Sequence, residues 1–225
     1  MNINDYKDKK LIGEGEYSKC YEIPNNEVLK VFNVPRKLYT LEKFEYFKDY
    51  TNDSFLFPYS FIYDEENFYG YISKKAHGKT LSSVIDDYTF KNLSKNSIKL
   101  QENIDYISEG KILMNDVHQN NVMYDGNIFE VIDADFYDIW SPDNVDRIKK
   151  TNAKSHRMMI IDLFLVPFFR QKKQYSHKYI VDKIKSYRFT DIKVNELILE
   201  LQNDMENYYK EEITKLSSLE KILRR

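Results

Sequence analysis

The hydrophobic pattern of this 225-residue chain changes near Gly78, and that change constrains the fold more than any other feature. Before it, short runs alternate apolar and polar residues, as half-buried strands do. After it, apolar residues recur mostly at the spacing of helices. The sequence therefore predicts an α+β chain. A small antiparallel β-rich lobe with one helix spans residues 1–74, and a larger, mainly helical lobe spans residues 75–225.

The expected elements follow from the same pattern. Strands are predicted at residues 11–12, 19–23, 27–32, 55–62 and 68–72. Pro35 opens a segment with apolar residues three apart, which predicts a helix over residues 35–50. Further helices are expected at 81–88, at 97–108 and from about 154 onward. A β-rich interlude is expected at 123–132, turning at Asp125-Gly126-Asn127.

Composition narrows the classes of function. A net charge of −2 lacks the basic excess that nucleic-acid binders usually carry. The longest apolar run, Met158–Phe169, is broken by Asp162 and is too short to span a bilayer. The first residues lack the apolar segment of a signal peptide. We therefore expect a soluble cytoplasmic protein with neither nucleic acid nor a membrane as a partner. The oligomeric state stays open.

The first chemical motif is Gly13-Glu14-Gly15, placed between two expected strands. Glycine lets backbone N–H groups approach phosphates that a Cβ would block. The chain has six glycines, so a Gly-x-Gly pair is expected by chance roughly 0.16 times. The alternative is a tight hairpin turn.

The second motif is Lys30, in an otherwise apolar strand. It either meets an anion there or, as an edge-strand lysine, faces water.

The third motif joins Asp116, Asn121 and Asp133. Asp116 and Asn121 lie five residues apart in an expected loop, and Asp133 follows an apolar strand twelve residues later. Phosphoryl transfer needs an acid that orients a hydroxyl, plus oxygen ligands for Mg²⁺. These three side chains supply that set. The alternative is that each Asp only terminates a strand or forms a turn.

Together these residues resemble the protein-kinase-like superfamily, from about Leu11 to Phe136. The matches are Gly13-x-Gly15-x-Tyr17-Ser18 as the glycine-rich loop, Lys30 as the phosphate-holding lysine, Asp116-x-x-x-x-Asn121 as the catalytic loop and Asp133 as the metal-binding acid. The resemblance implies a bilobal fold with ATP between the lobes. It also implies that Asn121 and Asp133 bind Mg²⁺, and that the backbone of Lys74 and Ala76 meets the adenine.

The departures from the family are informative. Met114-Asn115 replace the His-Arg of protein kinases, and Ala134-Asp135 replace Phe-Gly, so that Asp135 either adds a second acid at the metal or faces solvent. His118 is more like the pattern of small-molecule kinases, although it could equally be a structural hydrogen-bonder. The glutamate that would pair with Lys30 is Glu42 or Glu45, and the family spacing favours Glu45.

The resemblance implies an ATP- and Mg²⁺-dependent kinase in which Asp116, Lys30 and Asn121 are catalytic. Chain size favours a protein Ser/Thr hydroxyl as the acceptor. His118 and the absence of Ala-Pro-Glu instead favour a small-molecule acceptor such as an aminoglycoside or choline. A third hypothesis is a pseudokinase binding module.

A rival phosphate loop, Ser73–Thr80, ends in Gly-Lys-Thr like a Walker A motif, but Ser73 replaces its first glycine.

Overall fold

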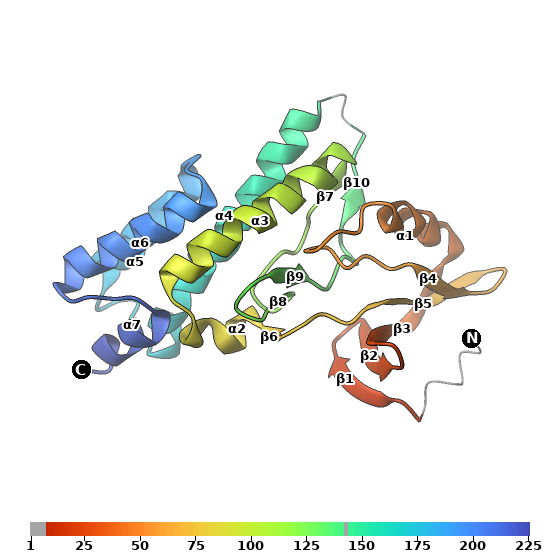
Figure 1. Ribbon diagram of the computed structural model, residues 1–225, viewed down its shortest axis with the longest axis horizontal. Helices are drawn as coiled ribbons and strands as arrows, with labels where there is room; N and C mark the ends of the chain where they lie inside the picture. The colour runs from red at the N-terminus through yellow and green to blue at the C-terminus, as the bar shows by residue number, and fades with distance from the viewer. Residues whose placement is uncertain (1–7, 142–143) are drawn as a thin grey trace. The chain divides into compact units, whose positions relative to one another are not determined.

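The computed structural model describes residues 8–141 and 144–225 of the chain. The chain divides into two compact units, Met1–Ala76 and His77–Arg225. The first is built on a five-stranded antiparallel sheet, and the second is mainly helical (Figure 1). The α+β class and the order of its two parts are thus confirmed.

The sheet of the N-terminal unit has the strand order β1-β2-β3-β5-β4. Its strands are β1 (Lys10–Glu14), β2 (Ser18–Ile23), β3 (Glu27–Lys37), β4 (Ser60–Tyr63) and β5 (Asn67–Lys74). Every pairing is antiparallel. The three strands predicted before residue 33 are present, and β3 is the central strand of the sheet.

The helix predicted to start at Pro35 starts later. Strand β3 continues through Pro35 to Lys37, a 3₁₀ turn (Leu38–Thr40) follows, and α1 spans Leu41–Lys48. Pairing between β3 and β5 is interrupted between Val31 and Arg36, so the missing N–H of Pro35 breaks no ladder bond. The predicted apolar face is real, because Leu41, Phe44 and Phe47 are all buried.

The strand predicted at residues 55–62 is also shorter in the structure, because β4 begins at Ser60. Phe55 and Phe57 are buried by stacking: the rings of Phe47 and Phe57 are 5.1 Å apart, and those of Phe55 and Phe57 are 5.7 Å apart. The apolar residues of this segment therefore build core without joining the ladder.

Gly70 marks the closest approach of the two central strands. It pairs with Val31 across β3 and β5. A Cβ added at Gly70 would overlap the backbone carbonyl oxygen of Lys30, whereas one added at Gly13 would meet Cys20 Cβ at an ordinary 3.7 Å. The sheet therefore requires glycine at position 70 and does not require it at position 13.

The C-terminal unit combines helices with two small sheets. Strands β6 (Lys79–Thr80), β8 (Val122–Tyr124) and β9 (Phe129–Val131) form one sheet, and β7 (Ile112–Leu113) pairs with β10 (Asp138–Ile139) in the other. Its α-helices are α2 (Leu81–Val84), α3 (Phe90–Glu109), α4 (Val145–Arg170), α5 (Lys178–Ser186), α6 (Val194–Tyr209) and α7 (Leu216–Leu223), with 3₁₀ turns at Ile85–Asp87 and Tyr187–Phe189.

The predicted hairpin and helices are present with shifted ends. The β8–β9 hairpin turns at Asp125–Asn127 as expected, with Gly126 at φ +98°. Helix α3 begins at Phe90 instead of residue 97, because the side chain of Thr89 caps it by accepting from the N–H of Asn92 at 3.2 Å. Helix α4 begins nine residues before Lys154, capped by Asn144.

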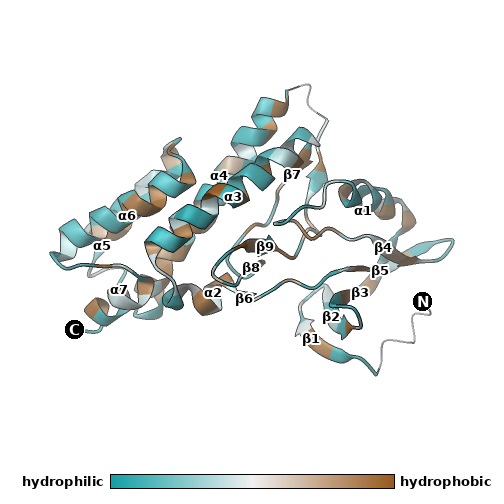
Figure 2. Ribbon diagram, viewed as in Figure 1, coloured by the Kyte–Doolittle hydropathy of each residue, from teal (hydrophilic) through white to brown (hydrophobic). Residues whose placement is uncertain are grey.

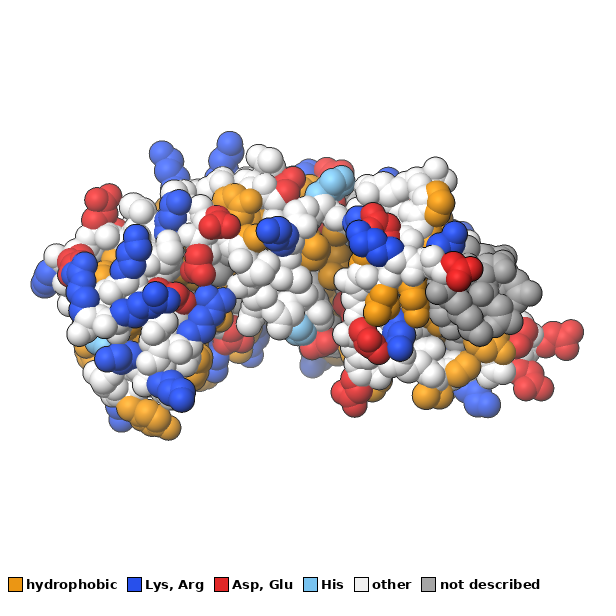
Figure 3. Space-filling view, turned by 90° about the horizontal axis from the view of Figure 1, so that it is seen from below, with side chains coloured by type: hydrophobic (Ala, Val, Ile, Leu, Met, Phe, Trp, Pro, Cys, Tyr) orange, Lys and Arg blue, Asp and Glu red, His pale blue; other side chains and the backbone are white. Residues whose placement is uncertain are grey.

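Helix α3 packs against both α4 and α6 (Figure 1). Apolar and polar bands alternate along α3 and α6, so each has a face for the core and a face for solvent (Figure 2). At the end of the chain that carries α5, α6 and α7, the surface mixes basic with acidic side chains (Figure 3). Among the described helices, none has the length and apolar character needed to cross a membrane.

Polar side chains interrupt the buried face of α4. Asn152, His156 and Arg157 are buried together with Ile148 and Met159 on the same helix. His156 Nδ1 lies 3.0 Å from Oε1 of Gln101 on α3. Burial, reinforced by the positive charge of Arg157, lowers the pKa of His156 to about 3. The imidazole is therefore neutral in the folded protein at neutral pH.

Gly70→Ala should destabilise the N-terminal unit by about 1–3 kcal/mol, because the new methyl group forces β3 and β5 apart. Gly13→Ala is the matched control and should change the free energy of unfolding far less. Urea denaturation followed by far-ultraviolet circular dichroism measures both. Equal stability of the two variants would contradict the close approach at Lys30.

His156 should make the protein less stable in acid. The unfolded chain takes up a proton near pH 6.5, whereas folded His156 does so only near pH 3. The free energy of unfolding should thus fall as the pH drops from about 6.5 towards 3, by a few kcal/mol in order of magnitude. His156→Gln should flatten this slope in urea titrations at several pH values. His118→Gln, the control at a less buried histidine, should retain it.

Candidate functional site

The glycine-rich segment forms the β1–β2 hairpin. The Gly15 N–H donates to the carbonyl oxygen of Ser18 at 2.9 Å, which closes the turn. Asn33 fastens the same turn, because its Nδ2 donates to the carbonyl oxygens of Gly15 at 3.2 Å and Glu16 at 2.9 Å. A Cβ at Gly13 or Gly15 would meet ordinary contacts, and neither residue has a positive φ. The hairpin itself therefore does not explain why both positions are glycine.

Lys30 lies on the central strand β3 and is only 5% exposed. The interpretation of Lys30 as an edge-strand lysine facing water is therefore wrong. Its Nζ lies 5.8 Å from the centre of the Tyr71 ring. The neighbouring aromatic side chains include Phe32, whose ring lies 6.0 Å from that of Tyr71. An anion close to a buried lysine stabilises the charged form of its side chain.

The remaining predicted nucleotide contacts of this unit lie on its surface or at its end. Glu42 and Glu45 are both exposed on α1, and among the described residues neither forms an ion pair. Lys74 ends β5. The next residue, Lys75, donates from its N–H to the Asn26 carbonyl oxygen at 2.9 Å, and Ala76 ends the unit. Tyr17 is exposed in the hairpin, and Ser18 is buried at the start of β2.

The rival phosphate loop does not have the form of a Walker A motif. Lys79 and Thr80 form strand β6, which pairs with β8, and α2 is only four residues long. Gly78 has φ +73°, and a Cβ there would overlap the carbonyl oxygen of Tyr124. The backbone is thus packed against a strand and does not open into a phosphate cradle. His77 is held as well, because its Nδ1 lies 3.0 Å from Oε1 of buried Glu130.

The predicted catalytic loop connects β7 to β8. Asp116 is exposed in this loop and has a left-handed backbone with φ +60°, which aspartate tolerates better than most residues. His118 Nδ1 accepts from the N–H of Asn120 at 3.2 Å, so the neutral ring carries its proton on Nε2. That Nε2 lies 3.7 Å from Asp116 Oδ1. The histidine is therefore placed beside the carboxylate.

Asn121 closes the loop onto Asp116. Its Nδ2 donates to the backbone carbonyl oxygen of Asp116 at 3.1 Å and lies 3.5 Å from Asp116 Oδ2. The Ile132 N–H donates to the carbonyl oxygen of Asn121 at 3.0 Å, which extends the β8–β9 pairing by one step. Asp133 is the next residue after Ile132. The hairpin thus brings Asn121 and Asp133 to the same end, beside the loop that carries Asp116.

Tyr137 lies within the field of both acids. It is fully buried, and its pKa is raised well above the usual value by burial first and then by the negative charges of Asp133 and Asp116. Asp133 also orders the chain that follows it, because its Oδ1 accepts from the N–H of Asp135 at 3.2 Å. Asp135 is buried. The possibility that Asp135 faces solvent is therefore wrong.

Two asparagines hold the loop in place. Asn115 Nδ2 donates to the carbonyl oxygen of Phe136 at 3.0 Å, which links the loop to the segment after Asp133. Asn152, on α4, is fully buried; its Oδ1 accepts from the N–H of Met114 at 2.8 Å. Its Nδ2 donates to Ile112 O at 2.8 Å and to Ser108 Oγ at 2.9 Å.

Asn152 is not among the residues that the sequence predicts for this site. A signal was present, because Asn152 follows Ile148 by one helical turn and so falls on the apolar face of α4. A polar residue on a buried face needs hydrogen-bond partners, which here are backbone groups around the loop. The family resemblance predicts no hydrogen bond for Asn115, which differs from the residue found there in protein kinases.

The oxygen donors at this site suit Mg²⁺. The hydrogen bonds of the Asn121 side chain use its nitrogen, so its Oδ1 is the atom that would bind a metal, together with the carboxylate of Asp133. Within residues 8–141 and 144–225, no group of three or more His, Cys, Asp or Glu residues is arranged to hold a metal. A pair of protein ligands is the usual contribution to Mg²⁺ that is also bound by phosphates.

No model of a known protein family matches the chain, and no curated protein is significantly similar to it in sequence.

Asn152→Ala should destabilise the C-terminal unit by about 2–4 kcal/mol, because it leaves buried backbone groups of Met114 and Ile112 without partners. Thr151→Ala, at the preceding and less buried position, is the control and should be nearly neutral. Thermal unfolding monitored by the fluorescence of Trp140 compares them. Similar melting temperatures for the two variants would contradict the stabilising role of the Asn152 hydrogen bonds.

Proposed function

We propose that the protein is an ATP- and Mg²⁺-dependent phosphotransferase of the bilobal, protein-kinase-like type. The observation that carries this proposal is the grouping of Asp116, Asn121 and Asp133 around one loop and one hairpin end. The three side chains are an acid, an amide and a second acid, the set that phosphoryl transfer requires. Buried Lys30 and the Gly13–Ser18 hairpin of the N-terminal unit supply the expected phosphate contacts.

Each residue has a distinct role in this proposal. Asp116 orients the acceptor hydroxyl and accepts its proton, and its exposure in the loop leaves it accessible. Asn121 and Asp133 bind Mg²⁺, which neutralises charge on the phosphates. Lys30 binds the phosphates of ATP. The backbone of the Gly13–Ser18 hairpin covers them, and the backbone of Lys74 and Ala76 meets the adenine.

The acceptor we favour is a Ser or Thr hydroxyl of a protein. A small-molecule hydroxyl is the second candidate, and a specific contact favours it: His118 lies beside Asp116, with Nε2 3.7 Å from Oδ1. Incubation with γ-labelled ATP and Mg²⁺ separates the two when one arm holds a heat-inactivated protein extract and the other a panel of aminoglycosides, choline and related alcohols. Label in neither arm favours a pseudokinase.

Asp116→Asn should lower kcat by about 10²–10⁴-fold, because the amide cannot accept the proton of the acceptor hydroxyl. ATP binding, followed by fluorescence of a labelled nucleotide, should be retained. Asp125→Asn is the matched control: Asp125 Oδ1 accepts from the N–H groups of Asn127 and Ile128, and the amide oxygen of Asn can accept the same bonds. Equal kcat in the two variants would refute the role of Asp116.

Lys30→Met should weaken ATP binding strongly, because it removes the positive charge that faces the phosphates. Lys79→Met should leave ATP binding unchanged, since Lys79 is exposed on β6. Titration with labelled nucleotide measures both dissociation constants, and circular dichroism confirms that both variants are folded. The opposite result, loss of binding only in Lys79→Met, would favour the Ser73–Thr80 segment as the phosphate site.

A further inference from the structure

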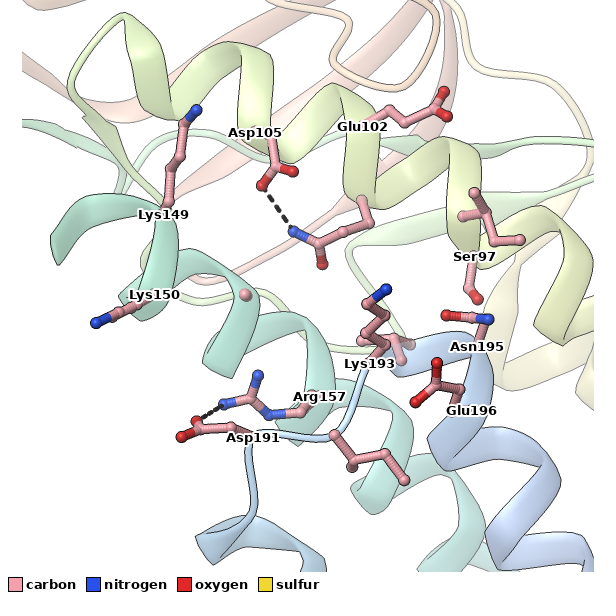
Figure 4. Close-up of a pocket in the computed structure, with 15 residues that line it drawn as sticks. Ser97, Glu102, Asp105, Lys149, Lys150, Arg157, Asp191, Lys193, Asn195 and Glu196 are labelled. Carbon is pink, nitrogen blue, oxygen red and sulfur yellow. Dashed lines mark hydrogen bonds and ion pairs between the residues drawn. The ribbon is translucent and has the colours of Figure 1, made fainter. Parts of the chain in front are cut away.

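A second site lies within the C-terminal unit, in a pocket between α3, α4 and the start of α6 (Figure 4). Its volume is about 600 Å³, a size common for small-molecule sites. Ser97 and Asp105 line it from α3, Lys149 and Arg157 line it from α4, and the segment Asp191–Glu196 closes it. None of Asp116, Asn121 and Asp133 lines this pocket, so it is separate from the site proposed above.

Arg157 is the most buried charge in this pocket, with only 9% of its surface exposed. Within the described chain, its one hydrogen-bond partner is Asp191, whose Oδ1 lies 3.4 Å from Nη2. Nε of Arg157 is buried and has no hydrogen-bond partner. A buried guanidinium with five N–H donors and one long bond has unused capacity for an anion.

Asp191 is a weak partner because its side chain is fully exposed, at 105% of the reference area. An exposed carboxylate gains little from such a bond, since water solvates it equally well. Figure 4 shows Asp191 on the loop before α6, with the guanidinium of Arg157 extending towards it. A ligand anion inside the pocket could therefore replace Asp191 at small cost.

The N-terminus of α6 contributes a second attraction for anions. Lys193 is the N-cap residue of this 16-residue helix, and no side chain caps it. The first-turn residues Val194, Asn195 and Glu196 line the pocket. The N–H groups of a first turn have no partner within the helix and carry partial positive charge. Ser94 Oγ donates to the Asn195 carbonyl oxygen at 2.8 Å, which fixes this turn against α3.

Lys150, Lys193 and Glu196 also line the pocket, and three of its other charged side chains are already engaged. Lys149 Nζ lies 3.0 Å from Glu109 Oε1, and Asp105 Oδ1 accepts from Gln101 Nε2 at 3.0 Å. Glu102 Oε2 lies 3.8 Å from Lys99 Nζ. Ile98, Ala153 and Ile192 add apolar wall.

We propose that this pocket binds a small organic anion. Its carboxylate or phosphate group lies between the guanidinium of Arg157 and the first turn of α6, and its apolar body packs against Ile98 and Ile192. The bidentate geometry of a guanidinium suits either group, because both present paired oxygens.

Isothermal titration calorimetry of the full chain with phenyl phosphate, benzoate and inorganic phosphate tests this proposal. Saturable binding of phenyl phosphate or benzoate is expected, and the tighter of the two identifies the preferred anion. Inorganic phosphate should bind more weakly because it lacks the apolar body. No saturable binding of either aromatic anion at millimolar concentration would overturn the proposal.

Substitutions separate this site from non-specific attraction. Arg157→Gln should weaken binding of the preferred anion at least tenfold, and Lys154→Gln, on the same helix but outside the pocket, should leave it unchanged. Asp191→Asn should tighten binding several-fold, because it frees the guanidinium. Asp191 is exposed, so this variant tests the site even if Arg157→Gln fails to fold. Unchanged affinity in Asp191→Asn would overturn the role of Arg157.

Discussion

The candidate catalytic loop depends on one buried amide, that of Asn152. Strand β7, which leads into the loop, and its partner β10 are two residues long each and pair only with one another. Such short strands are not stable alone. Asn152, which lies on α4, stabilises this region by hydrogen bonds to the backbone of Met114 and Ile112 and to the side chain of Ser108 on α3. The loop is thus positioned by contacts from a 26-residue helix.

The same helix explains why polar groups are tolerated in this core. Asn152, His156 and Arg157 lie on α4, and each faces a different kind of partner. Asn152 satisfies backbone groups, and His156 stays neutral against Gln101. Arg157 lines the wall of a pocket and bonds to Asp191. Buried polar groups cost free energy unless they are bonded, so each one restricts how α3, α4 and α6 can pack.

Sequence patterns predicted the arrangement of elements better than their ends. The spacing of apolar residues along the chain reflects which face of a strand or helix is buried. This spacing therefore indicates the type and order of the elements. The predicted ends of elements are wrong where a buried residue does not belong to a strand or helix, or where tertiary contacts interrupt a strand ladder. Phe55 and Phe57 are buried outside any strand, and Pro35 lies within β3 because the ladder is interrupted there. Neither arrangement can be read from spacing, because both depend on tertiary contacts.

The candidate site shows the same division. The sequence predicts Asp116, Asn121 and Asp133 as site residues because their own side chains carry the carboxylate and amide groups that the chemistry needs. The residues that hold the loop in place could not be predicted in this way. Asn115 and Asn152 bind backbone groups of residues that lie far from them in the sequence. Lys30 is intermediate: an apolar strand indicated burial, but only the central place of β3 excludes an edge-strand lysine.

Lys30 also shows why the sheet constrains chemistry. The backbone of β5 approaches β3 so closely at Lys30 that only glycine fits at position 70. The lysine stem therefore lies on a strand packed closely against β5, on the face that carries Tyr71. A flexible lysine loses side-chain entropy when it binds an anion, and one already confined by packing loses less. The packing of Lys30 thus lowers the entropy cost of the phosphate contact that we propose for it.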